Sequence, residues 1–424
     1  MKAVLDHFRV LSQIPHCSFE TEQMRDFLLA FAKQCGAKVE VDELGNIYAC
    51  KGEPKLCLQS HYDMVCMGQA PRLELFEEGG YLKAKDSSLG ADNGMGCAIM
   101  METLQHFSHL ECLWTNDEEV GLVGANGLKH RLKSKKLLNL DHECDFEVTI
   151  GCAGGVDIFA RMDYELEEKE AEFYEVEVFG FKGGHSGVDI LHNSSNAIKT
   201  LAAFLAQNDA ELIEFCGGER INSIPKYAKA KVIFPHSPKE TPQIRWKLMG
   251  MERVKVLKDS SKFLASLNAF AHGLRSFNPI LQIAQTSINL ALARLEEGQI
   301  KIDLFARSND EKELRQIGFE TEAFFTSFGY KVSFAKFYLP WEPKENAFSQ
   351  EVLKVMKAHN PKARYYAIHA GLECGVIGAK QKELECCSIG PNIYNPHSTD
   401  ERCEIASVER IAKVVFEVME KNQA

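Results

Sequence analysis

The sequence lacks both a basic block and an apolar run long enough to cross a membrane. The formal net charge is −11 at pH 7, and the acidic side chains are spread along the whole chain. Proteins that bind nucleic acid carry clustered lysine and arginine, so nucleic acid is not an expected partner. A membrane-spanning helix needs about 20 consecutive apolar residues, so no membrane partner is expected either. The first residues become charged and amphipathic at once, without the apolar core of a signal peptide, and we therefore expect a cytoplasmic protein.

Cys-x-x-Cys pairs are also missing, although the chain contains 14 cysteines. Several cysteines lie inside apolar runs, as Cys57, Cys97 and Cys112 do, and Cys386 and Cys387 are direct neighbours. Free cysteine is among the most buried residue types, and disulfides are rare in the cytoplasm. We therefore expect reduced, mostly buried thiols.

The sequence contains no internal repeat and no low-complexity stretch. Its 424 residues, 45% of them hydrophobic, are enough for two or three domains with cores of their own. An acidic stretch, residues 163–172, precedes a new alternating run, and helix–strand alternation returns after Tyr338. We expect an α/β fold with a catalytic domain in two parts, residues 1–170 and 338–424, interrupted by a smaller α/β domain, residues 171–337.

Hydrophobic periodicity predicts the main elements. Near the N-terminus we expect helix over residues 5–36, broken at 14–18, and then a hairpin over residues 39–50. The remaining predicted helices cover residues 95–107, 196–207, 255–274, 310–328 and 405–419.

Histidine and carboxylate side chains follow the apolar, strand-like runs between residues 56 and 140. His61 follows the first run, Glu118 and Glu119 the second, and Asp141 the third, while Asp92 lies in a glycine-rich turn. Side chains at the carboxyl ends of parallel strands meet in one crevice of an open α/β sheet. Several carboxylates in one crevice repel one another unless a multivalent cation lies between them. Any one of these groups alone would more often be structural, but the complete series indicates a metal site, most simply a dinuclear zinc site.

The spacing within this series suggests separate roles. Asp63 lies two residues after His61 in an extended segment, so its side chain points to the same side and can fix the tautomer of the imidazole. The neighbours Glu118 and Glu119 point in alternate directions, so that one can bind metal while the other remains a base. A metal lowers the pKa of bound water toward ~7 and polarises a carbonyl group, which is suited to hydrolysis of an amide bond.

Ten short motifs span nearly the whole chain in order. They are Ile14-Pro15-His16, Gly45-Asn46, His61-Tyr62-Asp63-Met64-Val65, Leu89-Gly90-Ala91-Asp92-Asn93-Gly94, Glu118-Glu119-Val120-Gly121, Gly151-Cys152-Ala153-Gly154-Gly155, Gly183-Gly184-His185-Ser186-Gly187, His369-Ala370-Gly371-Leu372-Glu373-Cys374-Gly375, Gly390-Pro391 and Pro396-His397-Ser398. Together these motifs resemble a known family, the zinc exopeptidases of the carboxypeptidase G and aminoacylase group, and most closely its peptidase D (aminoacyl-histidine dipeptidase) branch. The resemblance implies a two-domain zinc exopeptidase fold, with a mixed-sheet catalytic domain interrupted by a smaller α/β lid domain.

The resemblance implies a ligand set for two zinc ions per chain. Asp92 would bridge the two ions, His61 and Asp141 would complete one site, and Glu119 and His397 would complete the other. Glu118 would be the general base and later the proton donor to the leaving amine, and Asp63 would orient His61. Carboxylate and imidazole ligands also suit manganese and cobalt.

In the lid, His185 resembles a histidine that stabilises the oxyanion, in many relatives that of the partner subunit, which implies a homodimer formed through the lid. The glycines beside it could alternatively mark only a turn. Asn222 resembles an asparagine near the substrate, or else it is a turn residue. Arg307 could bind the carboxylate of a dipeptide through two hydrogen bonds, and a surface salt bridge is an equally good interpretation.

His369 and Glu373 are four residues apart in the motif that is most specific for this branch. They are expected either to bind substrate or to brace the sheet. Two departures from the family pattern concern Thr399, where the family usually has proline, and a shorter lid than in larger relatives. The shorter lid leaves the substrate range and the dimer interface undecided.

Our hypothesis from the sequence is a zinc-dependent dipeptidase that cleaves unblocked dipeptides, Xaa-His among them, through a metal-bridging hydroxide. One alternative is a tripeptidase or an N-acyl amino acid deacylase of the same superfamily. An alternative of another class is a non-catalytic scaffold with a degenerate site, although every expected ligand position is filled.

Overall fold

The computed structural model describes residues 2–193, 195–238 and 241–423. The chain forms two compact units. The first unit comprises Met1–Gly151, Pro343–Ala367 and Leu372–Ala424, and the second comprises Cys152–Glu342 and Ile368–Gly371. The second unit is therefore inserted into the first, as the sequence analysis expects.

The bounds of the second unit differ from the predicted 171–337. Strand β9 (Gly154–Asp163) belongs to the second unit because it pairs with β16 (Gln299–Ser308) and β17 (Lys331–Tyr338). Most of the acidic stretch that suggested a domain boundary is part of β10 (Leu166–Val178), which pairs along its length with β13 (Ile244–Leu257). Residues 166–172 of this strand are exposed or half-buried, and for this reason the stretch looks solvated in the sequence.

An eight-stranded mixed sheet forms the centre of the first unit. In spatial order its strands are β1 (Lys38–Val41), β2 (Ile47–Lys51), β6 (Leu110–Thr115), β3 (Leu56–His61), β7 (Lys136–Asn139), β19 (Glu385–Ser388), β8 (Glu147–Cys152) and β18 (Arg364–Ile368). Strand β3 runs parallel to both β6 and β7, and β19 runs parallel to β7. A smaller four-stranded sheet contains β20 (Ile393–Tyr394), β21 (Arg402–Glu404), β5 (Tyr81–Ala84) and β4 (Leu75–Glu78).

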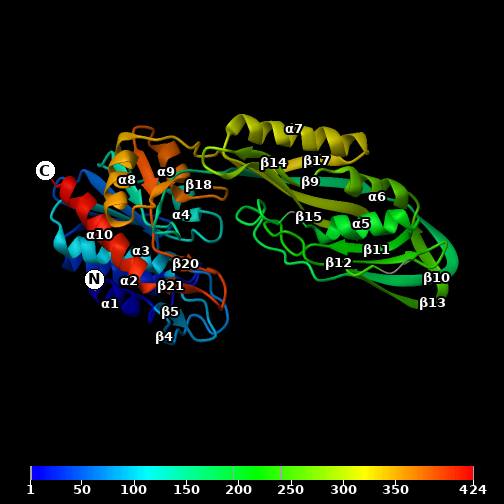
Figure 1. Ribbon diagram of the computed structural model, residues 1–424, viewed down its shortest axis with the longest axis horizontal. Helices are drawn as coiled ribbons and strands as arrows, with labels where there is room; N and C mark the ends of the chain where they lie inside the picture. Colours follow the sequence, from blue (N-terminus) through cyan, green and yellow to red (C-terminus); the bar gives the residue numbers. More distant parts are fainter. Residues whose placement is uncertain (1, 194, 239–240, 424) are drawn as a thin grey trace. The chain divides into compact units, whose positions relative to one another are not determined.

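Five helices share one hydrophobic core with the eight-stranded sheet. In α1, for example, Val4, Phe8 and Leu11 recur at helical spacing and are all buried. Figure 1 shows α10 alongside α3 in this unit. The five are α1 (Lys2–Leu11), α2 (Glu22–Gln34), α3 (Ala91–His106), α8 (Ala347–His359) and α10 (Ile405–Lys421), and the shorter α4 (Val123–Gly127) and α9 (Glu373–Lys380) pack against each other.

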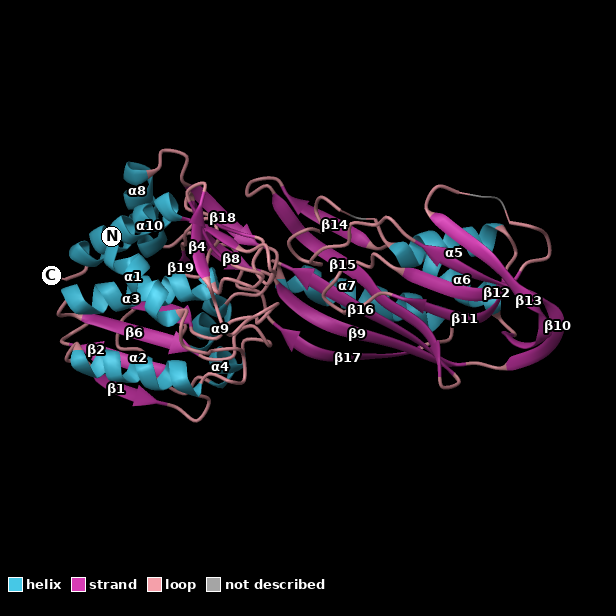
Figure 2. Ribbon diagram, turned by 90° about the horizontal axis from the view of Figure 1, so that it is seen from below, coloured by secondary structure: helices cyan, strands magenta, loops and turns pink. Residues whose placement is uncertain are grey.

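The second unit is built on a nine-stranded sheet that carries its helices along one face (Figure 2). The path along the sheet is β13, β10, β12 (Ala228–Ile233), β11 (Glu211–Gly217), β15 (Ile283–Glu296), β16, β9 and β17, with β14 (Gly273–Asn278) paired to β15. The helices are α5 (Ala197–Gln207), α6 (Ser260–Ala269) and α7 (Glu311–Ser327).

The predicted helices of the second unit are confirmed with one shortening. Asn196 and Asp310 cap α5 and α7, because their side chains accept hydrogen bonds from the first free backbone N–H groups. The predicted helix over residues 255–274 is only α6, since β13 extends to Leu257 and β14 begins at Gly273. Among the described residues, no helix is long and apolar enough to cross a membrane.

The cysteines depart from the sequence expectation at one place. Cys17 and Cys66 form a disulfide, so the expectation of reduced thiols is wrong for this pair. The two residues are 49 positions apart in the chain. Cys17 directly follows the motif that begins at Ile14, and Cys66 directly follows the motif that begins at His61. The expectation of buried thiols is confirmed for Cys50, Cys57, Cys97, Cys112, Cys386, Cys387 and Cys403.

Candidate metal centre

Parallel strand pairing brings the predicted site residues to one edge of the first unit's sheet. His61 is the last residue of β3, and it lies opposite Thr115, the last residue of β6. Asn139, at the end of β7, lies opposite Gln59 of β3. The segments that carry Glu118, Glu119 and Asp141 therefore leave the sheet at the same edge as His61, because parallel strands end on the same side.

The five predicted ligands form two groups that share Asp92. In the first group, His61 Nε2 lies 3.1 Å from Asp92 Oδ1 and 3.2 Å from Asp141 Oδ1. In the second group, His397 Nε2 lies 3.1 Å from Asp92 Oδ2 and 2.8 Å from Glu119 Oε1. Asp92 thus presents one carboxylate oxygen to each imidazole, which is the arrangement of a bridging ligand between two cations.

The donor set fits divalent cations. Glu119 Oε1 is buried and forms no hydrogen bond, although it lies close to His397 Nε2. Two donor atoms that are close together but not hydrogen-bonded to each other can both point at one ion. Among the described residues, no lysine or arginine forms an ion pair with Asp92, Glu118, Glu119 or Asp141, and groups of three ligand atoms lie within 4.8 Å of one another. Imidazole and carboxylate together suit zinc and related transition metals.

Burial, together with the neighbouring charges, raises the proton affinity of these carboxylates. Burial and the charge of Asp92 raise the pKa of Glu119 to about 7. Burial also raises the pKa of Asp141 to about 7, despite the attraction of His61. Although burial opposes it, the hydrogen bond to Asp92 and the nearby carboxylate of Glu119 raise the pKa of His397 to about 11. A bound cation would supply the positive charge that protons otherwise bring to this cluster.

Asp63 organises two of the segments that meet here. His61 Nδ1 lies 3.0 Å from the backbone oxygen of Asp63 and 3.4 Å from its Oδ1. The carboxylate also accepts hydrogen bonds from the backbone N–H groups of Glu118 (2.9 Å) and Glu119 (3.3 Å). The first role follows from the two-residue spacing in the sequence, whereas the second depends on a contact more than fifty residues away along the chain.

Glu118 is half-buried beside the two groups. Burial raises the pKa of its carboxyl group well above the ordinary value, and Glu119 and Asp141 raise it further, while His61 acts in the opposite direction. A carboxylate with a raised pKa can accept a proton near neutral pH and release it again. Glu118 can therefore exchange a proton beside the two groups of ligands.

Glu401 is a site residue that the sequence analysis missed. Its carboxylate is only 3% exposed and accepts backbone hydrogen bonds from Leu89 (2.7 Å), Gly90 (3.0 Å) and Ala91 (2.8 Å). These residues lead directly into Asp92, and Gly90 adopts a left-handed conformation, with φ 68°, that favours glycine. Glu401 lies four residues after His397, but its partners are 310 or more residues away, so sequence spacing gives no sign of this contact.

Glu373 lies beneath the metal ligands and has no exposed side-chain surface. Its Oε2 accepts hydrogen bonds from Thr115 Oγ1 (2.7 Å) and Gln59 Nε2, which belong to β6 and β3. This placement agrees with the alternative in which Glu373 braces the sheet, and it leaves no surface for contact with a substrate.

The second unit contains a buried arginine, Arg307, beside two histidines, His185 and His369. Arg307 is 5% exposed, lies 3.5 Å from His185 Nε2 through its Nη2, and donates a hydrogen bond from Nη1 to the Tyr338 hydroxyl group (3.3 Å). Its guanidinium group stacks on Phe305, 4.2 Å from the ring centroid. Among the described residues no carboxylate forms an ion pair with Arg307, and its Nε has no hydrogen-bond partner. A buried guanidinium group in this state is suited to an anionic ligand.

His369 belongs to the same cluster of the second unit, whereas Asn222 contributes mainly backbone. His369 is bonded to Ser287 Oγ (2.8 Å) and Asn309 Oδ1 (2.9 Å). Burial and the neighbouring charges of Arg307 and His185 lower the pKa of His369 to about 3, so the imidazole is neutral. The exposed Asn222 accepts a hydrogen bond from Ser186 N through its backbone oxygen (2.8 Å), next to His185.

Two family models match parts of the chain. The model of peptidase family M28 matches residues 46–211, and the model of a peptidase dimerisation domain matches residues 174–249. The first match covers the metal ligands up to Asp141, and the second lies entirely within the second unit. Each model covers less than half of the chain.

Nearly full-length relatives are found among characterised proteins and solved structures. The cytosol non-specific dipeptidase of Escherichia coli is 30% identical, over 98% of this chain and 96% of that protein. The crystal structure of an aminoacylhistidine dipeptidase from Vibrio alginolyticus is 28% identical, with a TM-score of 0.79, over 98% of this chain and 96% of that one. A tripeptidase structure from Staphylococcus aureus, 17% identical with a TM-score of 0.61 over 100% and 98% of the two chains, shares the fold.

The position of Glu401 leads to a test by substitution. Glu401→Ala should lower the affinity for divalent metal by about tenfold or more, because the segment before Asp92 loses its hydrogen-bond acceptor. Competition with a chromophoric chelator measures this affinity. Asp400→Ala removes an exposed carboxylate from the same loop and should leave the affinity unchanged. Equal affinities for the two variants would show that Glu401 does not position Asp92.

Proposed function

Because the chain belongs to the M20 peptidase family, the family of the dimerisation-domain model that it matches and of its nearly full-length relative, we propose that it is a metal-dependent dipeptidase that hydrolyses unblocked dipeptides, with Xaa-His dipeptides among them. The observation that carries the proposal is the position of Asp92 between two groups of ligands. The two relatives that match almost the whole chain at 28–30% identity are named as dipeptidases, which supports this choice of substrate class.

The proposed cofactors are two zinc ions per chain. His61 and Asp141 would hold one, Glu119 and His397 the other, and Asp92 both. Manganese or cobalt would suit the same oxygen and nitrogen donors. When bound, the cations supply a water of lowered pKa and polarise the scissile carbonyl group.

The chain's own groups then move the proton. Glu118 accepts the proton of the attacking water and passes it to the nitrogen of the leaving amine, in agreement with its raised pKa. Asp63 accepts hydrogen bonds from the backbone N–H groups of Glu118 and Glu119, and this contact fixes the position of the base relative to the metal ligand. Its contacts to His61 leave Nε2 of the imidazole directed at Asp92 and Asp141.

In the second unit, we assign His185 to the oxyanion and Arg307 to the carboxylate of the dipeptide. Arg307 is buried, is stacked on Phe305 and has no anionic partner among the described residues, which supports the assignment. The neutral His369 would brace this cluster from behind. Asn222 lies next to His185, where its exposed side chain is available to a substrate.

The proposed assembly is a homodimer formed through the second unit, and the proposed location is the cytoplasm. Strand β13 is the last strand of its sheet, and it exposes Leu248, Met249 and Met251. An exposed edge with apolar side chains is suited to pairing with a second copy. The match to a dimerisation domain overlaps this strand. The Escherichia coli relative is named as a cytosolic protein.

A substrate panel tests the proposed function. Chelator-treated protein, before and after zinc is restored, is assayed with β-Ala-His, Gly-His, Ala-Ala, a tripeptide and an N-acyl amino acid. We expect zinc-dependent cleavage of the dipeptides alone. Cleavage of only the tripeptide or the acylated substrate would replace the proposal by one of its two superfamily alternatives. An absence of zinc-dependent cleavage, together with an absence of bound metal, would favour the scaffold alternative.

The role of Glu118 is tested by Glu118→Gln, which keeps the size of the side chain but removes the base. Turnover should fall by at least about 100-fold, the usual contribution of general acid–base catalysis, while the metal content stays the same. Activity close to that of the unmodified chain would contradict the assignment. Loss of metal would instead show that Glu118 is a ligand.

The role of Arg307 is tested by Arg307→Ala. The KM for free dipeptides should rise by about tenfold or more, because a charge-assisted contact is worth roughly 1.5–3 kcal/mol. Dipeptide amides, which lack the carboxylate, should be affected much less. Arg315, which is exposed on α7 and pairs with Glu311, provides the matched control Arg315→Ala. An equal loss with free and amidated dipeptides would show that Arg307 is structural.

A further inference from the structure

We propose that Cys17 and Cys66 form a reversible redox modification site, whose disulfide form holds the metal centre together and whose dithiol form weakens it. The modifying reagent is of the thiol–disulfide class, such as glutathione. The consequence for turnover rests on the function proposed above, but the consequence for metal binding does not.

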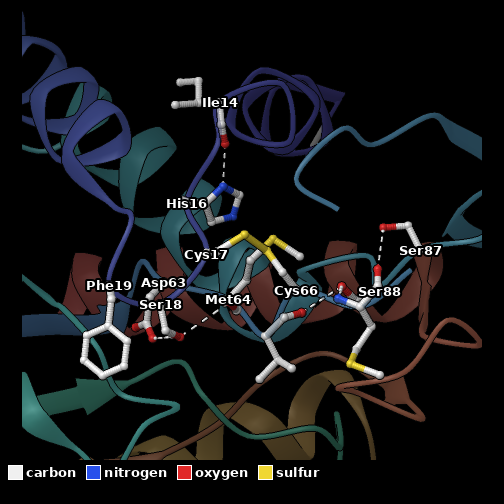
Figure 3. Close-up of a disulfide and its surroundings, with 12 residues drawn as sticks. Ile14, His16, Cys17, Ser18, Phe19, Asp63, Met64, Cys66, Ser87 and Ser88 are labelled. Carbon is white, nitrogen blue, oxygen red and sulfur yellow. Dashed lines mark hydrogen bonds between the residues drawn. A yellow bond between two sulfur atoms is a disulfide. The ribbon is translucent and has the colours of Figure 1, made fainter. Parts of the chain in front are cut away.

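The disulfide joins two segments that already lie against each other (Figure 3). The Cα atoms of Cys17 and Cys66 are 5.5 Å apart. Between the same segments, Met64 N donates to the backbone oxygen of His16 (3.0 Å), and Ser18 N donates to that of Met64 (3.2 Å). The covalent bond thus closes a short strip of backbone contacts between the turn after α1 and the segment after β3.

This strip reaches the metal centre through Asp63. Ser18, the residue next to Cys17, donates a hydrogen bond from Oγ to Asp63 Oδ2 (2.8 Å), which Figure 3 shows. Asp63 in turn positions both His61 and the backbone of Glu118 and Glu119. The next residue, Phe19, donates its backbone N–H to Asp117 Oδ1 (2.7 Å). A shift of Cys17 would therefore move the hydrogen-bond donors of Asp63 and Asp117, which lie in two of the metal-binding segments.

On the other side of the disulfide, the segment around Cys66 is tied to the segment that precedes Asp92. Ser88 Oγ donates to the backbone oxygen of Val65 (2.7 Å) and accepts from Met67 N (3.1 Å). Ser88 is followed by residues 89–91, which Glu401 holds in place. Hydrogen bonds consequently connect the segments around the disulfide to the three segments that supply His61, Asp92 and Glu119.

The pair is also accessible to a reagent, unlike most cysteines of this chain. Both Cys17 and Cys66 are half-buried. By contrast Cys57, Cys112 and Cys387 are buried, and burial raises the pKa of each of these thiols far above its ordinary value. Buried thiols with raised pKa react slowly, so chemical modification should be confined to the half-buried cysteines, which include this pair.

The exchange is balanced with two molecules of thiol. The thiolate of the first attacks one sulfur of the disulfide, the S–S bond breaks, and the released cysteine takes up a proton. The second thiol attacks the resulting mixed disulfide, which frees the other cysteine and forms the disulfide of the reagent. Two electrons pass from the reagent to the protein, and oxidation by glutathione disulfide reverses the sequence. In the cytoplasm, disulfides are typically transient or redox-sensing.

The experiment compares the holoprotein after incubation with reduced glutathione or with glutathione disulfide, each removed before measurement. Alkylation and mass spectrometry report the state of Cys17 and Cys66, and chelator competition reports zinc affinity. We expect the reduced form to bind zinc about tenfold more weakly and to turn over dipeptide correspondingly more slowly, as when support of a metal ligand is lost. The Cys17→Ser/Cys66→Ser double variant should match the reduced form and should not respond to either treatment.

The control is Cys35→Ser, which removes another half-buried cysteine and should leave the full redox response. Wild-type zinc affinity in the double variant, or equal affinity in the two redox forms, would overturn the proposal. Equal loss in the wild type and the double variant after glutathione treatment would also overturn it, because the effect would then arise at the metal. If no dipeptide is cleaved, the proposed function fails, but the zinc-affinity comparison still decides this inference.

Discussion

The carboxylate of Asp92, shared between two imidazole groups, is the interaction on which the rest of the first unit depends. Its two oxygens face His61 and His397, which lie more than three hundred residues apart in the sequence. The parallel strands β3, β6 and β7 bring His61, Glu119 and Asp141 to one edge, while Glu401 anchors the turn that carries Asp92. The sheet, Gly90 and the loop that carries Glu401 therefore all help to position Asp92 relative to the other metal ligands.

The two units differ in the charge of their buried polar side chains. The first unit contains a group of carboxylates that favours cations, because burial and the charge of Asp92 raise the pKa values of Glu119 and Asp141. The second unit buries Arg307 beside His185 and a neutral His369, which favours an anion. An unblocked dipeptide carries both a carbonyl group that a metal can polarise and a carboxylate that a guanidinium group can bind.

Much of the first unit could be predicted from the sequence, because its signals are local. Apolar runs followed by His61, Glu118 or Asp141 predict parallel strand ends, and the two-residue spacing of His61 and Asp63 predicts their contact. The contacts of Glu401 and Ser18 could not be predicted, since they depend on how distant loops meet. The acidic stretch within β10 was misleading for another reason: an exposed strand and a solvated linker have similar compositions. The pairing of Cys17 with Cys66 likewise depends on tertiary contact.

Anomalous diffraction from crystals of the zinc-loaded protein tests the central claim most directly. The account predicts two zinc peaks per chain, each about 2.0–2.2 Å from a different oxygen of Asp92, with His61 and Asp141 on one ion and Glu119 and His397 on the other. A single peak, or two peaks that do not share Asp92, would contradict it.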